Sequence, residues 1–97
     1  MTFDEFLPHY LDAHADRRTQ IVHALGTASA LALLTAAALK RRPQLVAAAL
    51  AAGYLPAWLS HFVIEGNAPK TFAYPLHSLR GDFVMVYKLL RGELPAI

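Results

Sequence analysis

Two long uncharged runs decide the fold of this chain. Residues 21–39 read IVHALGTASALALLTAAAL, and residues 45–63 read LVAAALAAGYLPAWLSHFV. A helix rises 1.5 Å per residue, so each run gives a helix of about 28 Å, close to the roughly 30 Å of hydrocarbon in a bilayer. We therefore predict transmembrane helices at 20–39 and 45–65.

The segment between the runs, KRRPQ at 40–44, is short and polar. It predicts a tight turn at the membrane surface, with Pro43 ending the first helix or opening the second. The two helices are then antiparallel and both termini lie on the same side of the membrane. Lys and Arg occur at both faces, so the positive-inside rule leaves the orientation open.

Composition supports a membrane environment. Hydrophobic residues make up 56% of the chain and charged residues 16%, against roughly 25% charged in soluble domains. The net charge is +2, but the basic residues flank the apolar runs as headgroup anchors do, instead of forming the single basic surface of a nucleic-acid-binding protein. The predicted partner is the lipid bilayer, with no nucleic acid.

Amphipathic segments flank the hairpin. Residues 1–15 predict an interfacial helix, with a capping box of Thr2 and Glu5 and a kink at Pro8. Gly66 and Pro69 predict a loop over 66–77, and residues 78–91 predict a second amphipathic helix that is too short and too charged to span. Residues 1–97 are thus expected to form one all-α integral membrane domain.

Two histidines stand where lipid is expected. Imidazole is costly in a bilayer, so His23 and His61 are candidates for a functional site. In a hairpin that turns at Arg42, residues whose numbers add to 84 lie at equal depth, and these two do. The rotation of each helix, which decides whether the rings face each other, is not fixed by the sequence.

Other polar residues extend this candidate site. Glu65 follows His61 by four residues and therefore lies on the same face of an α-helix. This spacing predicts that the two side chains share a metal ion or a proton. The alternative is that Glu65 is a solvated acid at the end of the helix. His14 precedes His23 by nine, so both reach one site only if Asp16 or Thr19 caps a helix and bends the chain.

These side chains suit a metal site without thiolates. The chain has no cysteine, so a metal must be held by histidine, carboxylate or carbonyl groups. Imidazole and carboxylate ligands suit Fe(II), Mn(II) or Zn(II). The alternative is that each histidine is a hydrogen-bonded polar group between helices.

Several motifs occur together in a specific order: Tyr10-Leu11-x-x-His14, His23-x-x-Gly26-Thr27, Trp58-x-x-His61-Phe62-x-x-Glu65-x-Asn67-x-Pro69 and Tyr74-Pro75-Leu76. This series resembles the family of the yeast 2-hydroxy fatty acid dioxygenase, which shortens 2-hydroxy fatty acids by one carbon in phytosphingosine breakdown. The chain is similar to its short bacterial branch, which implies a bacterial inner-membrane location.

The resemblance implies an Fe(II)-dependent membrane dioxygenase that uses O2 on a fatty-acyl substrate. The implied metal and catalytic residues are His14, His23, His61 and Glu65. The substrate-binding candidates are Arg17, Arg18 and Asn67, the arginines because a guanidinium suits a carboxylate.

The sequence is also compatible with two other functions. One is a non-enzymatic membrane protein in which a histidine network or metal site ties helices together, within one chain or in a homo-oligomer. The other is an ion carrier, which would require several copies of the two helices. Roles for His77 and Asp82 also stay open.

Overall fold

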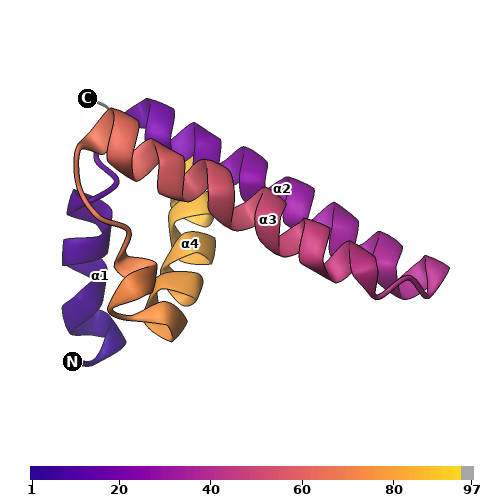
Figure 1. The fold of residues 1–97 in the computed structure, drawn as a ribbon. Coiled ribbons are helices and arrows are strands. Elements are labelled where there is room, and N and C mark those ends of the chain that lie inside the picture. Colours follow the sequence, from indigo (N-terminus) through magenta and orange to yellow (C-terminus); the bar gives the residue numbers. More distant parts are fainter. Residues whose placement is uncertain (95–97) are drawn as a thin grey trace.

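A computed structural model describes residues 1–94, which form four α-helices and no strand (Figure 1). Helices α2 (Arg17–Lys40) and α3 (Gln44–Ser60) make a long hairpin. Helices α1 (Phe3–Asp12) and α4 (Pro75–Leu90) pack against each other at the open end of that hairpin, far from its turn (Figure 1). The predicted all-α class is confirmed.

Side-chain caps start the first two helices. The Thr2 hydroxyl accepts from the Glu5 amide at the start of α1, as the sequence predicts. The Asp16 carboxylate accepts from the Arg18 amide at 2.8 Å and starts α2. The chain therefore breaks between Asp12 and Arg17, and Asp16 is the capping residue of the two that the sequence offers.

The two legs of the hairpin touch at their backbones. A Cβ added at Gly26 would lie 3.1 Å from the Ala52 carbonyl oxygen, so a larger residue there would push the two backbones apart by a few tenths of an ångström. At the turn, Arg41 takes a left-handed conformation, with φ of 52°. The Arg42 amide then donates to the Ala37 carbonyl and closes the end of α2.

Two helical stretches, Arg17–Lys40 and Gln44–Glu65, are long and apolar enough to cross a membrane. Large aliphatic side chains stay exposed along both, among them Leu25, Leu39, Leu50, Leu55 and Leu59. A surface of this kind on one small chain is typical of contact with lipid or with another protein.

The core of the short-helix end is aromatic. Phe6, Tyr10 and Met85 are at most 1% exposed and hold α1 against α4. Pro8 lies inside α1, which is continuous through it.

The segment after α3 differs from the predicted loop over 66–77. The second apolar helix ends in a π-helical turn, His61–Glu65, and a 3₁₀ turn follows at Lys70–Phe72. Helix α4 begins at Pro75, three residues earlier than expected, because proline at the first helical position has no amide hydrogen to satisfy.

Candidate metal centre

Three histidines from separate segments meet at the open end of the hairpin. His14 comes from the break between α1 and α2, His23 from α2, and His61 from the start of the π-helical turn. All three are buried, and their ligand nitrogens lie within 4.8 Å of one another. The rings of His23 and His61, expected at one depth, have centroids 5.3 Å apart.

Backbone carbonyls fix the protonation of two of these rings. His14 Nδ1 lies 2.6 Å from the Tyr10 carbonyl oxygen, and His23 Nδ1 lies 2.9 Å from that of Thr19. A carbonyl oxygen can only accept, so each Nδ1 carries the hydrogen. In a neutral ring the lone pair is then on Nε2.

Asn67 fixes the third ring. Its side-chain amide nitrogen donates to the Ala13 carbonyl at 3.3 Å, so its oxygen is the atom 2.8 Å from His61 Nδ1. His61 therefore donates from Nδ1 to Asn67 and keeps its Nε2 lone pair free. Acceptors on the outer nitrogen that hold a ring in one orientation are characteristic of metal-binding histidines.

The inner nitrogens fit a divalent metal ion. His14 Nε2 and His23 Nε2 are 3.2 Å apart, and neither carries a hydrogen to share. Metal–nitrogen bonds of about 2.0–2.1 Å place two ligand nitrogens of one ion roughly 3.0–3.4 Å apart. The observed separation is in that range, and two lone pairs facing each other are favourable only with a cation between them. The donor set thus suits a metal ion.

Burial also keeps His14 in its metal-binding form. Loss of solvent, with the neighbouring His23 ring as a smaller cause, lowers the pKa of His14 to about 2. The ring is therefore neutral at any physiological pH, although its hydrogen bond to the Tyr10 carbonyl acts in the opposite direction.

The π-helical turn brings Asn67 back to His61. Gly66 ends this turn with φ of 71°, a conformation that glycine adopts without strain, and the Gly66 amide donates to the His61 carbonyl. The Asn67 amide donates to the same carbonyl at 2.9 Å. Single π turns are frequent at functional sites, and here the turn directs the chain so that Asn67 reaches the ring.

Tyr10 and Asp82 support the centre from α1 and α4. The Tyr10 ring stacks on His14, with centroids 4.0 Å apart, and its hydroxyl donates to the Asp82 carboxylate. Gly81 makes room for this ring, since a Cβ there would lie 3.1–3.2 Å from its atoms. Burial raises the pKa of Asp82 to about 6, although the Tyr10 hydrogen bond lowers it.

The other candidates from the sequence are not among the three clustered histidines. Glu65 is outside the group of three histidines, because its carboxylate accepts from the Asp16 amide at 2.9 Å. Arg17 donates to the Leu94 carbonyl, and the exposed Arg18 pairs with Asp16. Neither contact leads to the histidines. Asn67, expected at the substrate, instead bonds to His61.

From the sequence, Tyr10 is expected only as part of the family motif and not as a residue that supports the centre. A usable signal was its spacing: it lies four residues before His14, so its carbonyl faces the same side of the chain as that ring. His77, left open earlier, lies outside the centre, with Nε2 3.0 Å from the Met1 carbonyl oxygen.

These features define a small all-α protein with two long apolar helices and a buried trio of histidines able to hold a metal ion. The chain belongs to the family described as 2-hydroxy-palmitic acid dioxygenase Mpo1-like, whose model matches residues 1–94. The resemblance found in the sequence is thereby confirmed, and the family name indicates a dioxygenase-related role. Neither a search of curated proteins nor one of solved structures found a match.

Proposed function

We propose that the protein is an Fe(II)-dependent membrane dioxygenase that shortens 2-hydroxy fatty acids by one carbon. The observation that carries this proposal is the convergence of three buried imidazoles, in which the Nε2 atoms of His14 and His23 face each other without a shared hydrogen and a His61 nitrogen lies within 4.8 Å. The family description names a 2-hydroxy fatty acid dioxygenase and supports the substrate class.

The chain's own residues prepare the centre. His14, His23 and His61 would hold the metal through Nε2, while Tyr10, Thr19 and Asn67 keep the rings oriented. Fe(II) held there would supply the activation of O2. One O2 and one 2-hydroxy acid balance to the shorter acid, carbon dioxide and water.

A purely structural histidine network is less consistent with this geometry. For His14 Nε2 to bond to His23 Nε2, one ring would need a second hydrogen and a positive charge. Burial opposes that charge, since the pKa of His14 lies far below its ordinary value. The trio therefore supports a metal site over a hydrogen-bonded tie between helices.

The proposal also places the protein in a membrane, with α2 and α3 spanning it, α1 and α4 at one interface and both termini on the same side. The exposed leucines of the hairpin would then face lipid. Because the chain has no cysteine, the single variants Thr2→Cys and Gln44→Cys can be labelled in sealed vesicles with an impermeant maleimide. Labelling from opposite sides supports the spanning hairpin, and labelling of both from one side contradicts it.

The test of activity uses the detergent-purified protein with Fe(II), O2 and a series of 2-hydroxy fatty acids. We expect the acid one carbon shorter from the wild type and from His9→Ala, whose side chain is exposed and outside the trio, and none from His61→Ala. A folded, metal-loaded wild type that shortens no acid of the series would refute the proposed activity.

A further inference from the structure

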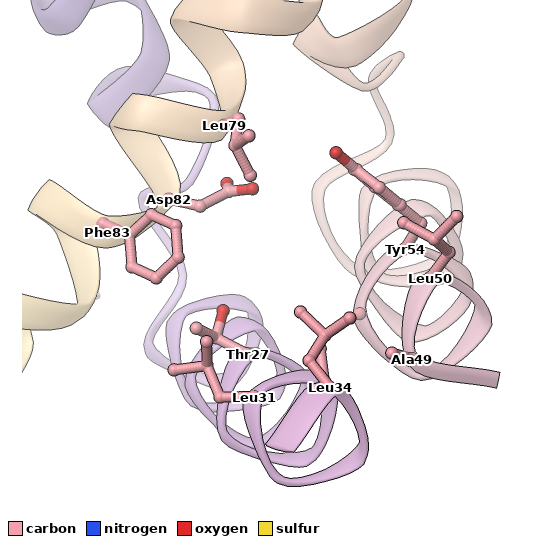
Figure 2. Close-up of a pocket in the computed structure, with 11 residues that line it drawn as sticks. Thr27, Leu31, Leu34, Ala49, Leu50, Tyr54, Leu79, Asp82 and Phe83 are labelled. Carbon is pink, nitrogen blue, oxygen red and sulfur yellow. The ribbon is translucent and has the colours of Figure 1, made fainter. Parts of the chain in front are cut away.

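A cavity of about 270 Å³ lies between α2, α3 and α4 (Figure 2). Its walls are mostly aliphatic or aromatic, and they include Leu31, Leu34, Leu50, Leu79 and Phe83. Figure 2 shows the polar side chains Asp82 from α4 and Tyr54 from α3 on opposite sides of the space, with the hydroxyl-bearing Thr27 from α2 below them.

The cavity extends away from the histidines along the hairpin. Thr27, at one end, is one helical turn from His23 on α2. Ala49, at the other end, precedes His61 by twelve residues, which corresponds to about 18 Å of helix. The space is therefore elongated, with one end close to the metal centre.

A chain of contacts joins the cavity to that centre. The Asp82 carboxylate lines the cavity and accepts from the Tyr10 hydroxyl, and the Tyr10 ring stacks on His14. Asp82 is thus two contacts away from a proposed metal ligand. Among the side chains lining the cavity it is the only ionisable one besides Tyr54.

Small residues create the space. Ala49 is buried at the floor, and a Cβ added at Gly53 would lie 3.4 Å from the Ala30 Cβ, so the two helices already touch beneath the cavity. The larger side chains Leu31 and Leu50 stand at its rim and are about half exposed, at 48% and 54%. The cavity is therefore open to the apolar outer surface of the hairpin.

We propose that this cavity binds the hydrocarbon chain of the substrate, with the 2-hydroxy acid head at the Asp82 end, and that Ala49 at the far end limits chain length. The inference rests on the proposed function. The aliphatic and aromatic side chains that line most of the cavity, with the Asp82 carboxylate at one end, suit a ligand that is apolar along most of its length and polar at one end. The opening toward the lipid-facing surface lets such a chain enter from the bilayer.

Two substitutions test the length limit. Ala49→Leu fills the far end, so the longest 2-hydroxy acids should lose at least about ten-fold in kcat/KM relative to shorter ones. Thr27→Phe blocks the space one turn from His23 and should leave only the shortest acids as substrates. The matched controls Ala48→Leu and Ala28→Phe lie on exposed positions beside these residues and should keep the wild-type profile.

A second measurement does not depend on turnover. A 2-hydroxy fatty acid with a diazirine near its chain end is photocrosslinked to the Co(II)-loaded protein, and the labelled peptides are mapped. We expect label on the cavity residues of α3 and α4, reduced several-fold in Ala49→Leu but not in Ala48→Leu. The milder Ala49→Val serves if the leucine variant does not fold.

The outcomes separate the two proposals. Label in the cavity without any turnover by the wild type would support the binding site and refute the activity. Turnover with an unchanged chain-length profile in both folded cavity variants would overturn the inference and leave the activity standing. Label confined to the outer positions of the hairpin would show that the acid lies on the apolar surface and not in the cavity, and would also overturn the inference.

Discussion

Asn67 offers the sharpest test of the metal centre, because it contacts a ligand without being one. Its side-chain oxygen accepts from His61 Nδ1 at 2.8 Å, and its nitrogen donates to the Ala13 carbonyl at 3.3 Å. Asn67→Ala removes both bonds. The His61 ring is then free to rotate or to move its hydrogen to Nε2, the atom that must carry a lone pair to bind metal.

The size of the effect follows from the lost acceptor. Leaving a buried donor without a partner costs about 1–3 kcal/mol, and loss of such an outer partner weakens metal binding by roughly 10- to 100-fold. We therefore expect the dissociation constant for Co(II) to rise by about that factor in Asn67→Ala. Asn67→Asp keeps an acceptor for His61 and should retain most of the affinity.

Titration of the detergent-purified protein with Co(II), followed by visible absorption, measures this constant. Thr35→Ala is the control, since its hydroxyl bonds only to the Leu31 carbonyl near the hairpin turn. Circular dichroism establishes that each variant is folded. If folded Asn67→Ala binds Co(II) as tightly as the wild type, then Asn67 does not orient a metal ligand and the reasoning is wrong.

Three further predictions concern the centre and its support. His61→Ala should abolish stoichiometric Co(II) binding while His9→Ala, an exposed residue, keeps it, as measured by metal analysis after gel filtration. Gly81→Ala places a Cβ 3.1–3.2 Å from the Tyr10 ring and should lower the free energy of unfolding by about 1–3 kcal/mol, visible as a lower melting temperature. The pKa of Asp82 is about 6 in the folded protein, above its ordinary value of 3.8. Between pH 3.8 and pH 6 the folded state therefore binds more protons than the unfolded state, so the Asp82 carboxyl destabilises the fold as the pH rises through this range. The stability of Asp82→Asn relative to wild type should therefore increase by at most about 3 kcal/mol from pH 4 to pH 6 in denaturant titrations. An equal dependence on pH in both proteins would contradict the assignment.

The helical hairpin could be predicted because it depends on length and polarity alone. The uncharged runs are long enough for two helices, and a short basic turn makes them antiparallel. The same turn sets His23 and His61 at one depth. The structure adds the helix rotation that the sequence does not fix, and it brings the two rings together at right angles, with centroids 5.3 Å apart. That rotation depends on which small residues meet, such as Gly26 against Ala52, and many such pairs exist in an alanine-rich hairpin.

Spacing alone did not predict that the Glu65 carboxylate would accept from the Asp16 amide, and a role for Glu65 at the metal stays a prediction. His61 and Glu65 are the first and last residues of a π-helical turn, and this turn sets the path of the chain that follows it. Glu65 then reaches the Asp16 amide, and Asn67 reaches the ring. A π turn has no strong signal in a single sequence, so its effect on the site could not be foreseen.

The origin of the three histidines in separate segments has a consequence for how the protein is made. A growing chain that has released only the first apolar run holds His14 and His23 but no third ligand. If the three histidines hold a metal ion, it can bind only after the second run has emerged and α1 has docked. A bound ion would stabilise the folded protein by about 2.7 kcal/mol when the free metal concentration is a hundred times the dissociation constant. Chelation would open the junction of α1 with the hairpin before the hairpin itself.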